Sequence, residues 1–369
     1  MTAAADATTT ITTTSTATRN NFPTGTDMKK MTVLLGMSGG MDSACAVTVL
    51  QKAGYEVRGA VLRMHSYSDT EGALDAAAAL GIDITAVNCA ADFTREVCGP
   101  FSSEYALGRT PNPCIICNEK VKFAKLIEEA DRRGIEKIAT GHYAGIELLE
   151  NGRYCIKRAK DEKKDQSYML WRLSQETLAR TVFPLYSHIK TDLREEARRM
   201  GLAAADKPES QEICFIPDGD YAAYIEKSLG IKFPEGDITD EDGKVIGRHS
   251  GIVRYTVGQR KGIGAYGKPM FVKRIDALNN RLVLGAAGEE YESTLEADGL
   301  IFSGAEPFEG TIECEVKHRY RAPAVPCTVT VKNGIASARL HTPARAITPG
   351  QSAVFYKDGC VLFGGFIKK

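Results

Sequence analysis

Short apolar segments alternate with segments of helical periodicity between residues 31 and 141, and this alternation restricts the fold more than any other feature. The apolar runs predict strands at residues 32–36, 56–62, 82–87 and 138–140. The segments between them predict helices at residues 43–53, 72–80 and 118–133. Strands that alternate with helices form a parallel sheet with helices on both faces, so we predict an α/β fold. Ligands of such sheets bind at the carboxyl ends of the strands.

The amino-acid composition and the predicted secondary structure change after this region. Residues 174–204 predict further helix, whereas glycine, proline and short β-branched runs dominate beyond Asp218. Evenly spaced apolar runs after residue 300 predict a small antiparallel β-barrel. Residues 1–28 are almost entirely Thr, Ala, Ser and Asn, which cannot build a core, so we expect a disordered tail there. We expect the remainder to form a nucleotide-binding domain, a small middle domain and the barrel, at residues 29–217, 218–288 and 289–369.

Charge and cysteine usage exclude several classes of protein. The 369 residues include 47 Lys and Arg and 47 Asp and Glu, so the formal net charge is zero. Any nucleic-acid partner must therefore be held by local basic patches. No apolar run approaches the roughly 20 residues that a membrane-spanning helix needs, so we expect no membrane association. Ten cysteines without a secretory signal indicate a reducing compartment, and we expect a cytoplasmic protein.

The loop between the first predicted strand and the first predicted helix reads Ser-Gly-Gly-Met-Asp-Ser, from Ser38 to Ser43. Its two glycines let the backbone approach a ligand closely, and the helix that follows presents N–H groups and the positive end of its dipole to an anion. No Lys follows the glycines, so this is neither the usual P-loop nor a dinucleotide fingerprint. A plain glycine turn with a helix cap is the alternative, but the position directly after a buried strand favours phosphate binding. The loop resembles the pyrophosphate loop of the adenylating ATP-pyrophosphatase (PP-loop) superfamily.

Two further segments carry cysteines in unusual surroundings. Cys117 directly precedes the predicted basic helix, and a thiol at a helix N-terminus near cations has a lowered pKa and more thiolate. We therefore predict that Cys117 is a nucleophile. Cys214 lies in a short loop of mixed polarity that follows Lys207.

These segments belong to a series of motifs that extends over almost the whole chain, from about Lys30 to the C-terminus. The series comprises Gly-Met-Ser-Gly-Gly-x-Asp-Ser, Gly-Arg-Thr-Pro-Asn-Pro-x-x-x-Cys-Asn, Ala-Thr-Gly-His-Tyr, Lys-Asp-Gln-Ser-Tyr, Ile-Cys-Phe-Ile, Tyr-Thr-Val-Gly-Gln-Arg-Lys-Gly, Arg-Tyr-Arg and Thr-Pro-Gly-Gln-Ser-Ala-Val-Phe-Tyr. In its motifs and their order the chain resembles the bacterial tRNA-specific 2-thiouridylase (tRNA-uridine 2-sulfurtransferase) family.

The resemblance implies an enzyme that uses ATP and Mg²⁺ to thiolate the wobble uridine of a tRNA anticodon. ATP adenylates O2 of the uridine, Cys214 carries a persulfide sulfur from a donor protein, and sulfur replaces oxygen as AMP leaves. Cys117 is the family's nucleophile and forms a disulfide with Cys214 during turnover. The residues implied to bind ATP are Gly36, Met37, Ser38, Gly39, Gly40, Met41, Asp42, Ser43, Met64 and Gly141. The residues implied to contact tRNA are Asn112, Pro113, Cys114, His142, Lys164, Asp165, Gln166, Arg319, Tyr320 and Gln351.

Cys114 departs from the commonest form of the family, which has at this position an Asp that is the family's proposed general acid and base. A thiol hydrogen-bonds only weakly, so either another group moves the proton or the chemistry differs. Cys114, Cys117 and Cys214 are three soft ligands that can hold a [4Fe–4S] cluster with one open iron to carry sulfide. The alternative is that Cys114 is a neutral replacement and the persulfide route stands.

Weaker signals point to RNA. Local basic clusters lie at residues 158–164, 194–199, 260–261, 273–274 and 317–321. Such clusters are usually solvated surface, but with the resemblance they fit a tRNA held through its phosphates. Tyr143, Tyr168 and Tyr320 are candidates for stacking on bases, and residues 258–264 predict an RNA-facing loop. Two other functions stay open: another adenylating PP-loop enzyme, and a non-catalytic tRNA-binding protein that holds ATP as a structural ligand.

Overall fold

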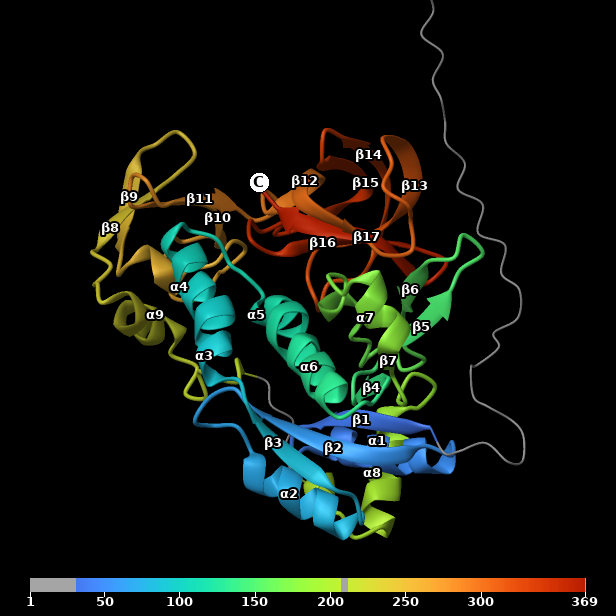
Figure 1. Cartoon of the computed structure of the whole chain (residues 1–369). Coiled ribbons are helices and arrows are strands. Elements are labelled where there is room, and N and C mark those ends of the chain that lie inside the picture. The colour runs from blue at the N-terminus through green and yellow to red at the C-terminus, as the bar shows by residue number, and fades with distance from the viewer. Residues whose placement is uncertain (1–30, 207–211, 369) are drawn as a thin grey trace, which may run out of the picture.

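The computed structural model describes residues 31–206 and 212–368, with the side chain of Ala203 excepted. The predicted tail at residues 1–28 and the segment 207–211 lie outside the described residues. In Figure 1 a parallel sheet lies at one end of the molecule, the C-terminal barrel lies at the other, and helices lie between them. Within the described part, no helix combines the length and the apolar character that crossing a membrane requires.

The predicted α/β fold is confirmed. Five parallel strands form a sheet in the order β3-β2-β1-β4-β7. Their bounds are Thr32–Met37 for β1, Glu56–Arg63 for β2, Ile84–Asn88 for β3, Lys137–Thr140 for β4 and Thr181–Val182 for β7. Helices cover both faces because successive residues of β1 point to opposite sides. Val33 and Leu35 pack toward one face, which is covered by α1 (Met41–Lys52), α2 (Thr70–Ala79) and α8 (Lys190–Arg199). Leu34 packs toward the other face, which is covered by α6 (Ala124–Arg132).

The helix predicted at residues 118–133 begins earlier than expected. The helical path starts with α5 (Pro113–Ile116), continues through a π-helical segment, Cys117–Phe123, and ends with α6. Asn112 caps it, because its side chain accepts a hydrogen bond from the backbone N–H of Cys114 at 3.1 Å. Cys117 therefore lies one turn inside a helical path, and the prediction that it stands at the helix N-terminus is wrong.

Several elements differ from the sequence-based expectation. Residues 174–204 are only partly helical: α7 (Gln175–Arg180) and α8 are separated by β7 and a loop. After β3 the chain forms α3 (Ala90–Phe93), a π-helical turn and α4 (Gly99–Ala106), which the sequence analysis left unassigned. The middle part of the chain contains α9 (Tyr221–Leu229) and a four-stranded sheet in the order β10-β11-β8-β9. These four strands are β8 (Gly236–Thr239), β9 (Val245–His249), β10 (Met270–Asp276) and β11 (Arg281–Ala286).

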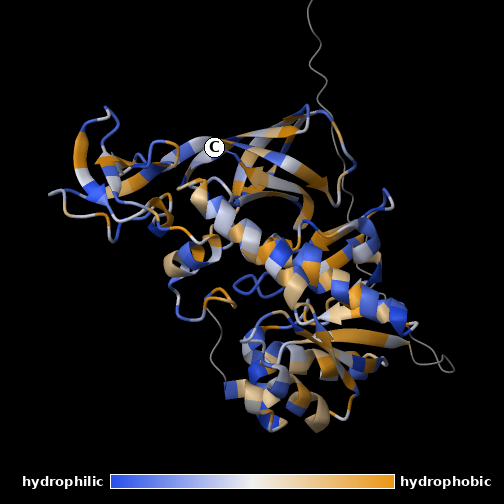
Figure 2. Cartoon of the chain, turned by 60° about the vertical axis from the view of Figure 1, so that its left-hand side comes forward, coloured by the Kyte–Doolittle hydropathy of each residue, from blue (hydrophilic) through white to orange (hydrophobic). Residues whose placement is uncertain are grey.

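The predicted C-terminal antiparallel barrel is confirmed. Its strands follow the order β12-β15-β14-β13-β16-β17, and pairing of β12 with β17 closes it. They are β12 (Tyr291–Phe302), β13 (Gly310–Lys317), β14 (Val325–Lys332), β15 (Ile335–Arg345), β16 (Ser352–Lys357) and β17 (Cys360–Ile367). Figure 2 shows hydrophobic residues along the strands of both the barrel and the parallel sheet, so each has an apolar interior of its own.

The barrel is joined to the rest of the chain by an element that the sequence analysis missed. A hairpin of β5 (Gly145–Leu148) and β6 (Tyr154–Lys157) extends the barrel sheet, with Lys157 paired to Cys360 of β17. Tyr168 and Trp171 reinforce the junction through Ser352. The hydroxyl of Tyr168 donates to the backbone oxygen of Ser352 at 3.0 Å, and the indole N–H of Trp171 donates to the side-chain hydroxyl of Ser352 at 3.0 Å.

Candidate functional site

The loop from Ser38 to Ser43, called the nucleotide loop below, connects β1 to α1, and its own hydroxyls hold it in shape. The hydroxyl of Ser43 donates to the backbone oxygen of Gly40 at 2.9 Å and accepts from the backbone N–H of Ser38 at 3.3 Å. Gly40 stands at the N-cap of α1 without a side-chain cap. The first turn of α1 can therefore present its N–H groups to an anion.

Glycine suits Gly39 in this loop and Gly36 in the preceding strand β1 for two different reasons. Gly39 has a φ of +74°, and a Cβ placed there would lie 2.6 Å from a carboxylate oxygen of Asp69. At Gly36 a Cβ would lie 3.0 Å from the side chain of Leu126 on α6. Met37 and Met41 are buried in the core, so only their backbone can face a nucleotide. The glycines thus let the loop fit between its neighbours.

Gly141 brings the carboxyl end of β4 against the same loop. A Cβ at Gly141 would lie 3.1 Å from the backbone carbon of Asp42 and from the backbone nitrogen of Ser43. The loop after β4 and the loop after β1 are therefore in direct contact at the sheet edge where parallel sheets bind their ligands. The two motifs that the resemblance assigns to ATP lie together, although more than ninety residues separate them in the sequence.

Asp42 is held by two residues that the sequence analysis did not place there. Lys190, the first residue of α8, has its ammonium 2.7 Å from one carboxylate oxygen of Asp42. The hydroxyl of Tyr143 donates to the other oxygen at 2.8 Å. Tyr143 and Tyr168 are both buried, so the expectation that they stack on RNA bases is wrong. No local motif reveals Lys190, which lies 148 residues after Asp42.

Met64 lies against Cys117. It follows β2, and its backbone N–H donates to the hydroxyl of Ser68 at 3.1 Å. Its sulfur lies 3.7 Å from the sulfur of Cys117. A residue that the resemblance assigns to ATP is therefore in contact with the predicted nucleophile.

A pocket of about 250 Å³ lies at the start of α5. It is lined by Pro111, Asn112, Pro113, Cys114, Glu212, Ile213 and Gln351. Three distant segments thus meet: the start of α5, the residues just before Cys214, and the barrel. The amide nitrogen of Gln351 donates to the backbone oxygen of Thr110, which fixes the barrel against the pocket rim. Glu212 was not a predicted site residue, although it stands two positions before Cys214.

Burial raises the pKa of the thiols in and around this pocket. Cys117 is buried, and burial raises the pKa of its thiol to about 12. The expected lowering of this pKa is wrong, because the helix starts four residues earlier and the sulfur faces the core. Cys214 has an exposed side chain, yet the protein atoms crowded around its sulfur raise its pKa to about 11. The positive charge of Lys122 opposes both shifts.

The thiols Cys114, Cys117 and Cys214 lie near one another: Cys114 raises the pKa of both Cys117 and Cys214, and Cys214 raises that of Cys117. All ten cysteines fall within the described residues and are free, so Cys117 and Cys214 are not joined in this structure. Among the residues that the structure describes, no three His, Cys, Asp or Glu side chains are arranged to hold a metal ion. Three thiolates of a [4Fe–4S] cluster each bind a different iron, so the iron–sulfur ligand set stays a prediction.

Several predicted tRNA-contacting side chains are engaged inside the protein. Asp165 is buried and accepts from the backbone N–H groups of Ala159 and Ser167 at 3.0 and 3.1 Å. Gln166 accepts from the backbone N–H of Tyr143 at 2.9 Å. These contacts shape the segment, and they leave a role in RNA binding as a prediction.

The other predicted contacts lie closer to the barrel or the sheet. Arg319 donates to the backbone oxygen of Val257 at 2.9 Å and to the hydroxyl of Thr348. His142 packs against the ring of Phe123, and burial holds its pKa well below the ordinary value, so it is neutral at pH 7. Lys164 and Tyr320 both have partners within the protein.

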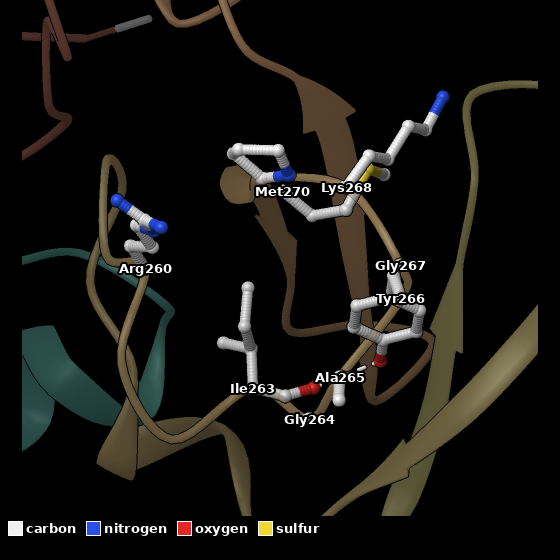
Figure 3. Close-up of a pocket in the computed structure, with 9 residues that line it drawn as sticks. Arg260, Ile263, Gly264, Ala265, Tyr266, Gly267, Lys268 and Met270 are labelled. Carbon is white, nitrogen blue, oxygen red and sulfur yellow. Dashed lines mark hydrogen bonds between the residues drawn. The ribbon is translucent and has the colours of Figure 1, made fainter.

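A second pocket, of about 330 Å³, lies in the middle part of the chain (Figure 3). It is lined by Arg260, Ile263, Gly264, Ala265, Tyr266, Gly267, Lys268, Pro269 and Met270. None of the nucleotide-loop residues or of the three clustered cysteines contributes to it. The loop predicted to face RNA forms one side of this pocket, so it belongs to a separate surface.

Three family models match successive parts of the chain. Residues 31–218 match the model of the tRNA methyl transferase HUP domain, residues 222–286 match the tRNA methyl transferase PRC-barrel domain, and residues 292–367 match the aminomethyltransferase β-barrel domain. The tRNA-specific 2-thiouridylase MnmA of Lachnoclostridium phytofermentans is 40% identical over 359 residues, which cover 93% of this chain and 100% of that protein. The proteins of the same name from Acetivibrio thermocellus and Chlorobium phaeovibrioides are each 41% identical, covering 92% of this chain and 100% and 98% of theirs.

Proposed function

Because this chain belongs to the tRNA-specific 2-thiouridylase family, we propose that it uses ATP to replace O2 of the wobble uridine of tRNA by sulfur. One observation supports the proposal: the loop from Ser38 to Ser43 meets Gly141 at the carboxyl edge of the sheet, and Met64, which follows the neighbouring strand β2, contacts Cys117. A uridine flipped out of the anticodon into the pocket would meet both ATP and the sulfur carrier.

The reaction divides into two steps. The uridine O2 attacks the α-phosphate of ATP, pyrophosphate leaves, and the resulting adenylate turns O2 into a leaving group. The terminal sulfur of a persulfide on Cys214 then attacks C2, the C–O bond breaks and AMP leaves. Cys117 attacks the inner sulfur of Cys214, releasing the sulfur now bound to the base and forming a Cys117–Cys214 disulfide that a thiol reductant must reopen.

The electrostatics set a requirement for this chemistry. Both thiols must lose a proton before they act, yet burial keeps their pKa values high. Lys122 is the nearby charge that favours the thiolates, and we assign it the role of supporting their formation. The exposed side chain of Cys214 suits delivery of sulfur by a donor protein with a persulfide or sulfide. The need for free thiols also suits the cytoplasm.

Of the two sulfur routes we propose the persulfide. In a [4Fe–4S] cluster each thiolate binds a different iron, so the cluster stays the alternative, and we derive no step through it. Iron and sulfide analysis of anaerobically purified protein tests this choice: about four irons per chain would overturn it. Mg²⁺ is proposed to arrive with ATP, because it is commonly held by substrate phosphates, waters and few carboxylates.

Mass spectrometry of tRNA from a deletion strain tests the function. We expect loss of 2-thiolated wobble uridine and its return with the wild-type gene. The variant Cys214→Ser should fail to restore thiolation while still forming the adenylate, whereas Cys314→Ser, on the barrel strand β13, should restore it. Full restoration by Cys214→Ser would contradict the mechanism, and unchanged thiolation in the deletion strain would contradict the function.

A further inference from the structure

Lys190 lies at the nucleotide loop but comes from a helix that follows it by 148 residues. We infer that the ammonium of Lys190 binds the pyrophosphate part of ATP, doing the work of the lysine that an ordinary P-loop carries after its glycines. The inference deepens the proposed function and rests on it for the identity of the nucleotide. The loop itself offers only backbone N–H groups and the hydroxyls of Ser38 and Ser43, whereas pyrophosphate carries several negative charges.

The position of Lys190 is fixed from three sides. Its ammonium lies 2.7 Å from Asp42 and 5.6 Å from the centre of the Tyr143 ring. Its backbone N–H donates to a carboxylate oxygen of Asp161 at 2.9 Å. The side chain is only 13% exposed, so the charge is held at one place and does not move freely through solvent. An ammonium fixed in this way loses little freedom when it binds a phosphate.

Asp42 places that charge at the start of α1. Asp42 is the second residue of this helix, directly before Ser43, and Gly141 lies close to the backbone of both residues. A phosphate bound by the first turn of α1 would therefore be near Lys190. An ammonium has three donors, so Lys190 can pair with Asp42 and a phosphate oxygen at the same time. Charge-assisted hydrogen bonds of this kind are about twice as strong as neutral ones.

The structural alternative is that Lys190 only neutralises Asp42 or joins α1 to α8. The chain offers a matched control for the second possibility, because Lys52 at the other end of α1 pairs with Glu196 of α8 on the surface. Lys190→Met and Lys52→Met each remove one ion pair between the same two helices. Only the first removes a charge at the nucleotide loop.

Calorimetric titration of the full chain with ATP, pyrophosphate and AMP tests the inference. We expect Lys190→Met to lower the affinity for ATP and for pyrophosphate by about 10- to 100-fold, because the variant loses one hydrogen bond between charged groups. AMP lacks the pyrophosphate part, so its affinity should stay near that of the wild type. Lys52→Met should bind all three as the wild type does, and Lys190→Arg, which keeps the charge, should recover part of the lost affinity.

A double variant separates phosphate binding from neutralisation of Asp42. If Lys190 only neutralises Asp42, then Asp42→Asn/Lys190→Met will bind ATP as well as Asp42→Asn alone, and the inference is overturned. If Lys190→Met lowers the affinities for AMP and ATP equally, the inference is also overturned. A wild-type protein that binds ATP with this lysine dependence but leaves tRNA unthiolated would refute the proposed function and leave the inference standing. If Lys190→Met does not fold, the comparison of Lys190→Arg and Lys190→Gln decides, since only the first retains a charge.

Discussion

Replacement of Gly141 by alanine should weaken ATP binding through a steric effect alone. The added methyl group would lie 3.1 Å from the backbone carbon of Asp42 and the backbone nitrogen of Ser43, and 3.2 Å from the backbone oxygen of Asp42. Backbone atoms cannot rotate away, so the nucleotide loop or the end of β4 must shift. Gly141 is not among the glycines with a positive φ, so alanine brings no strain of its own at this position.

Overpacking of this kind typically costs about 1–3 kcal/mol. If the loop absorbs the shift, that cost appears in ATP binding, and about 1.4 kcal/mol corresponds to a tenfold change in affinity. We therefore expect ATP to bind roughly 5- to 150-fold more weakly. If instead the cost destabilises the fold, the temperature of unfolding falls, so both quantities are measured on the same sample.

Gly99→Ala is the matched control. Gly99 has a helical φ of −61°, and a Cβ there would meet its nearest neighbour at an ordinary 3.6 Å. This variant should bind ATP like the wild type and unfold at the same or a slightly higher temperature, because alanine restricts the unfolded chain. A Gly141→Ala protein that matches the wild type in both ATP affinity and unfolding temperature would refute the assigned contact between the two loops.

Two further outcomes are expected. Asp165→Ala should reduce the free energy of unfolding, measured by urea titration, by about 3 kcal/mol, because it leaves buried donors of Ala159 and Ser167 without their acceptor. A variant with full stability and reduced tRNA affinity would show instead that Asp165 faces RNA. The rate at which iodoacetamide alkylates Cys214 should rise about tenfold per pH unit from pH 7 to 10, because a thiol with a pKa of about 11 gains thiolate throughout that range. Lys122→Gln should lower this rate. A rate that reaches a plateau below pH 8 would contradict the raised pKa.

Local patterns predicted the parts of this protein that depend on local chemistry. The nucleotide loop follows a buried strand and opens a helix as its glycines indicated, and the alternation of strands and helices gave the parallel sheet. The start of the Cys117 helix was also readable, because Asn112 followed by Pro113 is a preferred cap and first helical residue. Placing the helix start at Asn118 produced the wrong sign for the pKa of Cys117.

Features made by tertiary contact could not be predicted in this way. Lys190 and Asp42 have no shared motif, and only the packing of α8 on α1 brings them together. The pocket at Cys114 needs Gln351 from the barrel, which depends on how two domains dock. Tyr143 was a candidate for stacking on bases, whereas its hydroxyl donates to Asp42 inside the protein. Each of these errors concerns a partner far away in the sequence.

The hairpin β5–β6 makes the barrel sheet run on into the nucleotide-binding part of the chain. A hinge between the two would have to break backbone pairing at Lys157 and Cys360 and the buried bonds of Trp171 and Tyr168 to Ser352. The junction therefore fixes the distance between the barrel and the parallel sheet. Under the proposed function, a tRNA held by the barrel must bring its uridine to the reacting groups by a change in its own loop, because the two parts of the protein cannot move apart without breaking these bonds.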